Sequence, residues 1–144
     1  MMDASALLAL LLQEPGAEVM EHDVQGAALS TVNYSEVLKK VVERGGDVSA
    51  AMSMLSSLGL DLFPFEEWHA RDAAQLFPST KDHGLSFADR ACLALAIDLD
   101  GTLYTADKRL ADVPAPIEIV LIRQAHSNPA SQRKPVKSSL KSKS

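Results

Sequence analysis

The sequence predicts a single α/β domain built around a parallel sheet. Segments in which apolar residues recur at helical spacing alternate with short apolar stretches of strand length, which is typical of parallel sheets connected through helices. The chain has 144 residues, of which 47% are hydrophobic, and this is enough for one domain with an ordinary core.

The first half of the chain predicts four helices and one strand. Proline and glycine mark the ends of the helices, because neither residue continues a helix well. The apolar run after Asp3 stops before Glu14-Pro15-Gly16, and the next long helix stops at Arg44-Gly45-Gly46. The expected elements are a helix from Ala4 to Gln13, a short helix to His22, a strand from Ala27 to Val32, the helix that carries Glu36, and a helix from Ala50 to Leu58 that is opened by Asp47 or Ser49 and capped by Gly59.

The second half continues the alternation of strands and helices. Pro114-Ala115-Pro116 breaks the chain before its last apolar stretch. The expected elements are a strand from Leu60 to Phe63, a helix from Glu66 to Leu76, a loop from Phe77 to Gly84, the helix that carries Asp89, a strand from Thr102 to Thr105 and a last strand from Ile117 to Ile122.

Cysteine usage and hydropathy indicate a cytoplasmic protein. The single cysteine, Cys92, permits no internal disulfide and lies in an apolar helical stripe, where a buried thiol is expected. The apolar run from Ala4 to Leu12 has no basic segment before it and is shorter than the roughly 20 residues that span a bilayer. We therefore expect no membrane association.

Charge divides the chain into two parts. The whole chain carries a net charge of −5, whereas residues 124–144 carry +5 and no acid, which leaves −10 for residues 1–123. The tail is rich in serine and lysine and poor in apolar residues, so we expect a globular domain over 1–123 and a disordered basic tail over 124–144. Such a tail either contacts RNA phosphates or only aids solubility. Its cations are Arg133, Lys134, Lys137, Lys141 and Lys143.

Four acidic residues stand where a strand or loop leads into a helix. They are Asp3, Glu36, Asp89 and Asp107. Carboxylates gathered at the carboxyl edge of a parallel sheet can hold a hard divalent cation. A structural alternative exists for each acid, because Asn33-x-x-Glu36 and Ser86-x-x-Asp89 have the spacing of capping boxes, and Asp3 and Asp107 can cap helices.

Four sequence blocks that contain these acids resemble the PIN domain as it occurs in VapC-type toxins of bacterial toxin–antitoxin pairs. The blocks are DASALLALLLQEPGAE, NYSEVLKKVVERGGD, LSFADRACLALA and LYTADKRL, within residues 1–121. The resemblance implies a three-layer α/β/α fold with a short, mostly parallel central sheet. It also implies an endoribonuclease that depends on Mg²⁺ or Mn²⁺ and is inhibited by a cognate antitoxin.

The resemblance assigns a role to individual residues. Asp3, Glu36, Asp89 and Asp107 fall on the catalytic acidic quartet, and Ser5 and Thr105 fall on the hydroxyl positions that support it. Asp3, Asp89 and Asp107 would bind the metal, and Glu36 would orient or deprotonate the attacking water. Only Met1 and Met2 precede Asp3, so the first strand must be very short. A non-catalytic interaction module is therefore a second hypothesis.

A competing motif, Asp98-Leu-Asp100-Gly101-Thr102, matches the DxDGT signature of haloacid-dehalogenase-like phosphatases. Their nucleophilic Asp ends a strand, whereas Asp98 follows a segment with helical spacing. We expect Asp98 to Gly101 to form a helix end and turn.

The apolar belt from Met52 to Phe63 exceeds what the core requires, and it predicts a homodimer or another partner surface.

Overall fold

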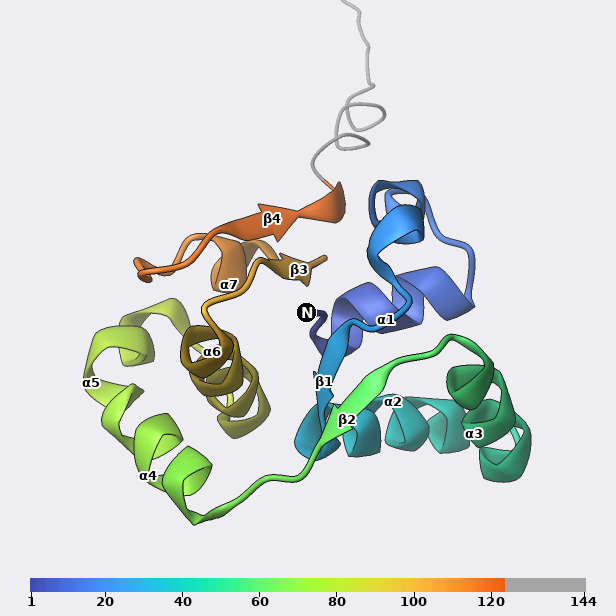
Figure 1. Ribbon diagram of the computed structural model, residues 1–144, viewed down its shortest axis with the longest axis horizontal. Coiled ribbons are helices and arrows are strands. Elements are labelled where there is room, and N and C mark those ends of the chain that lie inside the picture. The colour runs from blue at the N-terminus through green and yellow to red at the C-terminus, as the bar shows by residue number, and fades with distance from the viewer. Residues whose placement is uncertain (124–144) are drawn as a thin grey trace, which may run out of the picture.

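The computed structural model describes residues 1–123, and within them short parallel strands lie among helices (Figure 1). The predicted α/β class is confirmed. The strands are β1 (Ala28–Ser30), β2 (Asp61–Phe63), β3 (Leu103–Thr105) and β4 (Ile119–Leu121). The helices are α1 (Ala4–Leu11), η1 (Ala17–Asp23), α2 (Thr31–Glu43), α3 (Val48–Ser57), α4 (Glu67–Gln75), α5 (Phe77–Thr80), η2 (Lys81–His83), α6 (Phe87–Leu99) and α7 (Lys108–Ala111).

The backbone of the first three residues joins two pairs of strands. β1 pairs in parallel with β2, and β3 pairs in parallel with β4. Met2 N–H donates to the carbonyl of Ala28 at 3.3 Å, and Asp3 N–H donates to the carbonyl of Tyr104 at 3.1 Å. Met2 thus forms a parallel bridge with Tyr104, and its segment lies between β1 and β3 (Figure 1). The expected very short first strand is reduced to this one bridge.

Two groups of buried side chains hold the helices against the strands. One lies around α1, β1 and α2 and contains Met2, Leu7, Met20 and Leu29, while the other lies under α6 and includes Leu93. Cys92 is fully buried and unpaired, as expected. No helix in the described part of the chain is long and apolar enough to cross a membrane.

Several predicted boundaries were wrong for local reasons. Ser30 accepts a hydrogen bond from Val32 N–H and caps α2, so the first predicted strand ends two residues early. The predicted loop from Phe77 to Gly84 contains α5 and η2, because Pro78 fits the first turn of a helix. Asp47, and not Ser49, caps α3. Residues 124–144, and with them the predicted tail, lie outside the described residues.

Gly16 allows a close contact between the loop after α1 and the end of β4. Its φ of +99° favours glycine, and a Cβ there would lie 2.5 Å from the carbonyl oxygen of Ile122. Gly26 also has a positive φ, +80°, but a Cβ on it would meet nothing within 4 Å. Comparing substitutions at the two glycines therefore distinguishes the cost of backbone strain, which both share, from the cost of steric overlap, which only Gly16 has.

Gly16→Ala should lower the free energy of unfolding by about 3 kcal/mol or more, whereas Gly26→Ala should lower it by about 1 kcal/mol, the usual cost of left-handed backbone for alanine. Urea unfolding followed by circular dichroism measures both values. Equal losses for the two variants would show that the segment around Ile122 moves away without cost.

Candidate active site

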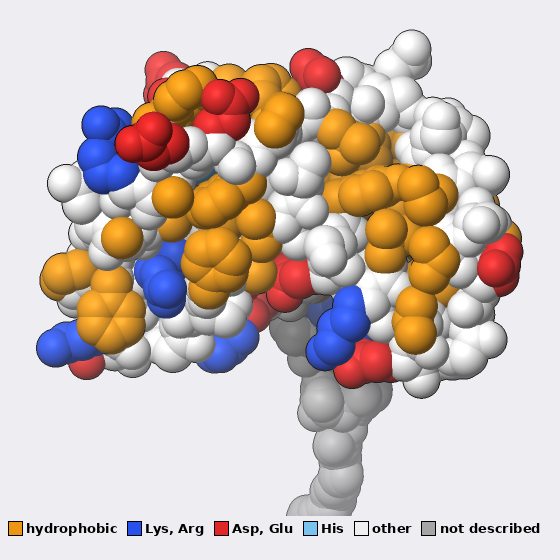
Figure 2. Space-filling view, turned by 90° about the horizontal axis from the view of Figure 1, so that it is seen from below, with side chains coloured by type: hydrophobic (Ala, Val, Ile, Leu, Met, Phe, Trp, Pro, Cys, Tyr) orange, Lys and Arg blue, Asp and Glu red, His pale blue; other side chains and the backbone are white. Residues whose placement is uncertain are grey.

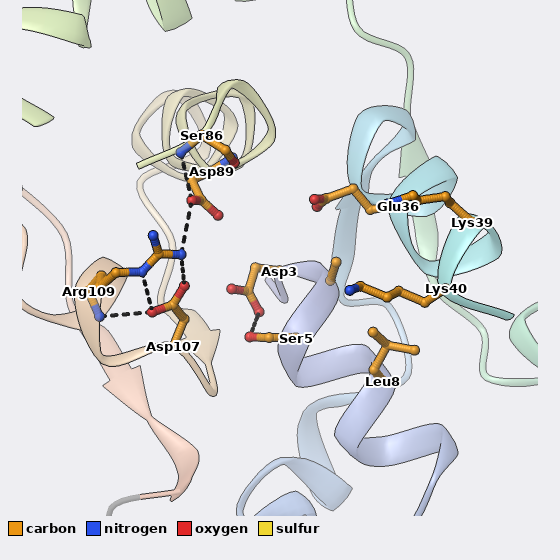
Figure 3. A pocket seen from close by; sticks show the side chains of 11 residues that line it. Asp3, Ser5, Leu8, Glu36, Lys39, Lys40, Ser86, Asp89, Asp107 and Arg109 are labelled. Carbon is orange, nitrogen blue, oxygen red and sulfur yellow. Dashed lines mark hydrogen bonds and ion pairs between the residues drawn. The ribbon is translucent and has the colours of Figure 1, made fainter. Parts of the chain in front are cut away.

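A pocket of about 340 Å³ opens between α1, α2, α6 and α7. Figure 3 shows Glu36 on α2 facing Asp89 and Asp107 across the pocket, with Asp3 between them. The four acids that the sequence singled out thus come from four separate elements and line one pocket. Its lining residues are Asp3, Ala4, Ser5, Leu8, Glu36, Lys39, Lys40, Ser86, Asp89, Asp107 and Arg109.

Asp3 is fixed by the start of α1 and by the end of β3. Its carboxylate caps α1 by accepting from Ala6 N–H at 2.8 Å, and it also accepts from Ser5 Oγ at 2.8 Å and Thr105 Oγ1 at 2.6 Å. Ser5 Oγ in turn accepts from Ala106 N–H at 2.9 Å, and Thr105 Oγ1 accepts from Asp107 N–H at 3.0 Å. The two hydroxyl residues therefore connect Asp3 to the segment that carries Asp107.

Asp89 and Asp107 hold helix starts as well as lining the pocket. Ser86 and Asp89 form the predicted capping box at the start of α6, with hydrogen bonds of 2.9 and 3.2 Å. Asp107 caps α7 by accepting from Arg109 N–H at 2.9 Å. Each of these two acids can therefore hold the start of a helix and line the pocket at the same time.

Glu36 is held differently from the other three acids. The capping box predicted for Asn33 and Glu36 was wrong, because Ser30 caps α2 and both residues lie inside the helix. Asn33 is buried, and its Nδ2 donates at 3.2 Å to Glu36 Oε1 and at 3.2 Å to the carbonyl of Ala88 on α6. Asn33 thus orients Glu36 and links the two helices that form opposite walls of the pocket.

Burial and charge set the protonation of the pocket. Burial raises the pKa of Asp3 from 3.8 to about 6, although three hydrogen bonds from Thr105, Ala6 and Ser5 oppose this. Burial also raises the pKa of Glu36, which the Asn33 hydrogen bond partly offsets. The hydrogen bond from Arg109 lowers the pKa of Asp107.

The chemistry of the donors fits a hard divalent cation. The pocket presents carboxylate and hydroxyl oxygens, which are the ligands that Mg²⁺ and Mn²⁺ prefer. Buried Asp3 accepts only from neutral donors, so its negative charge is not neutralised by a direct contact. As the side chains are arranged, no three Asp, Glu, His or Cys residues among positions 1–123 are grouped to hold a metal ion. Arg109 pairs with Asp107 at 2.7 Å and lies 4.0 Å from Asp89.

The phosphatase-like motif lies elsewhere. Asp98 is in the last turn of α6, and Asp100 ends that helix in a left-handed conformation with φ of 52°. Neither residue lines the acidic pocket. The expected helix end and turn is confirmed, and it lacks the strand end on which a phosphatase nucleophile would stand.

A family model described as the PIN domain matches residues 1–116. The chain belongs to the PIN domain family. PIN domains are typically metal-dependent nucleases. The fold is similar to that of PAE2754 from Pyrobaculum aerophilum, with a TM-score of 0.56 and 21% sequence identity over 83% of this chain and 81% of that chain. No curated protein gives a significant match.

The sequence did not indicate four residues that line the pocket of this PIN domain or hold one of its acids. Asn33 was noted only as a capping residue, and Lys39, Lys40 and Arg109 were assigned no role. The helical spacing of Glu36, Lys39 and Lys40 could have placed these lysines on one side of α2. Nothing in the sequence indicates that Arg109 turns toward Asp89.

Asp3→Asn should make the metal-free protein more stable at neutral pH. An acid with a higher pKa in the folded chain than in the unfolded chain binds more protons when folded, so Asp3 lowers stability as pH rises from 3.8 to about 6. The variant should therefore gain about 1 to 3 kcal/mol at about pH 7.5 and about 1 kcal/mol or less at about pH 4.5.

Urea unfolding at both pH values tests this, with Asp98→Asn, an exposed acid on α6, as the control. A stability difference between Asp3→Asn and wild type that does not change with pH would contradict the proposed burial of charge. A gain of the same size in Asp98→Asn would assign the effect to net charge.

Proposed function

We propose that this PIN domain is a metal-dependent endoribonuclease of the VapC type. The observation that carries the proposal is the convergence of four carboxylates from α1, α2, α6 and α7 on one pocket. Gathering such charge is unfavourable unless a cation binds, and a nuclease uses that cation to neutralise a phosphate.

The four acids divide into two proposed roles, metal binding and activation of water. Asp3, Asp89 and Asp107 would hold Mg²⁺ or Mn²⁺, which when bound lowers the pKa of water and neutralises charge on the phosphodiester. Glu36 faces these three acids and accepts the proton of the attacking water. Its raised pKa brings it closer to the working pH, which suits a general base. Ser5 and Thr105 hold Asp3 in place.

The toxin role adds protein partners to the proposal. A mainly apolar groove of about 240 Å³ between α1, α2 and α3 would receive a helix of the cognate antitoxin. Its apolar lining consists of Leu8, Leu11, Leu12, Val41, Ala50, Ala51 and Met54. The cations at positions 133, 134, 137, 141 and 143 are proposed to add contacts to RNA phosphates.

A non-catalytic interaction module is the alternative, and the pairing of Arg109 with Asp107 is the observation that favours it. In that case the acids would bind cationic side chains and not a metal. Metal-dependent cleavage of RNA by the isolated chain distinguishes the two functions.

Asp89→Asn should lower the rate of RNA cleavage in Mg²⁺ or Mn²⁺ by about 100-fold or more, the scale expected when a charged active-site group is lost. The amide oxygen can still accept from Ser86 N–H, so α6 should remain capped. Cleavage of a fluorescent RNA with and without a chelator measures the effect. Asp98→Asn is the control and should cleave at the wild-type rate. Hydrolysis of a phosphate monoester that is lost in Asp98→Asn and unchanged in Asp3→Asn would instead support a phosphatase.

The exposed apolar side chains near α3 and β2 are proposed to form a homodimer interface. Met52 and Leu62 are each 44% exposed. Figure 2 shows the molecule from below the view of Figure 1, and on that face apolar side chains gather over the region of α2 and α3. Burying such side chains between two copies would remove apolar area from water.

Met52→Glu should shift the protein from dimer to monomer, because the interface would have to bury a charge. Light scattering after size-exclusion chromatography measures the mass. Val19→Glu, which changes a 43% exposed side chain on η1, should stay dimeric. A monomeric wild-type protein at high concentration would rule out the proposed dimer.

A further inference from the structure

Arg109 is the cation in closest contact with the candidate active site. Its Nη2 lies 2.7 Å from Asp107 Oδ2, its Nε lies 3.2 Å from Asp107 Oδ1, and its Nη2 lies 4.0 Å from Asp89 Oδ2. Its Nη1 also donates to the carbonyl of Gly84 at 2.8 Å. Figure 3 shows the guanidinium between the two carboxylates.

The other cations that line the pocket are paired elsewhere. Lys39 Nζ lies 3.0 Å from Glu43, and Lys40 Nζ lies 3.8 Å from the same residue. Among the ion pairs of residues 1–123, those of Arg109 alone reach a pocket acid. The side of the pocket formed by Asp89 and Asp107 therefore has a cation of the protein in contact, which offsets one of its two negative charges, whereas no ion pair among residues 1–123 reaches Asp3 or Glu36.

We propose that Arg109 is a resident counter-ion that competes with a divalent metal ion for Asp89 and Asp107. The inference rests on the proposed metal-dependent function. Both oxygens of Asp107 accept from Arg109, so a metal ion that binds this carboxylate must compete with the guanidinium.

The contact is suited to displacement. The Arg109 side chain is 56% exposed, so the freed guanidinium can be hydrated, and exposed ion pairs contribute little to stability. Asp107 and Asp89 are 24 and 14% exposed, so they gain more from a doubly charged ion. Arg109 thus offsets part of the charge repulsion between the two acids without metal, and it sets a threshold for metal binding.

The test is a calorimetric titration of metal-free protein with Mn²⁺ in the absence of RNA, at about 0.15 M salt. Arg109→Gln should bind Mn²⁺ roughly 3- to 10-fold more tightly than wild type, because the competing bidentate pair is gone. Arg109→Lys keeps the charge but loses the planar fork, so its affinity should lie between these two. It also provides the comparison if Arg109→Gln does not fold, as judged by circular dichroism.

Lys108→Gln is the matched control. It removes the same charge from the neighbouring residue, whose Nζ pairs with Asp112 at 2.7 Å and does not line the pocket. Its affinity for Mn²⁺ should equal that of wild type. Equal affinity of Arg109→Gln and wild type would overturn the inference, as would an equal gain in Lys108→Gln.

Cleavage assays on the same proteins separate this inference from the proposed function. Metal-dependent cleavage of RNA by wild type, together with unchanged affinity in Arg109→Gln, would overturn the role of Arg109 and leave the nuclease intact. Absence of both Mn²⁺ binding and cleavage in every variant would overturn the two proposals together.

Discussion

The architecture depends on the hydrogen bonds of a single extended segment, Met1 to Asp3. Its backbone connects to Ala28 on one side and to Tyr104 on the other, so two separate pairs of strands become one parallel arrangement. Met2 is fully buried and anchors the segment in the core. Because Asp3 follows directly, the same bonds that join the strands also fix the first acid of the pocket relative to Thr105 and the start of α7.

Electrostatics and local folding are coupled at this pocket. Three of its acids lie in the first turn or at the N-cap of a helix, and the partial positive charge of a helix amino terminus stabilises a nearby carboxylate. That stabilisation is insufficient for Asp3, whose buried charge keeps its pKa high. The pocket therefore combines an acid that lacks a cationic partner with an acid, Asp107, that already has one. A cation that binds in the pocket therefore contacts one side with an unpaired carboxylate, Asp3, and one side where Asp107 is already paired with Arg109.

The sequence predicted the order of the elements and the acids of the pocket, since both depend on local patterns and on resemblance to the PIN domain. It could not predict contacts between distant segments. The 25-residue separation of Arg109 from Gly84 hides their contact, which exists only because α7 packs beside the start of α6. Asn33 was misread because its spacing to Glu36 equals that of a capping box, although Ser30 caps the helix three residues earlier. Its contact with the carbonyl of Ala88 is a tertiary property that no local pattern shows.

Glu36 differs from its three acidic neighbours in what its replacement would cost the fold. Asp3, Asp89 and Asp107 each accept a backbone hydrogen bond at a helix start, so replacing any of them removes a contact that holds a helix end. Glu36 lies within α2 and caps nothing, and its side-chain hydrogen bond comes from Asn33. A substitution at Glu36 therefore changes the charge of the pocket with less disturbance of its helix starts than a substitution at any of the other three acids.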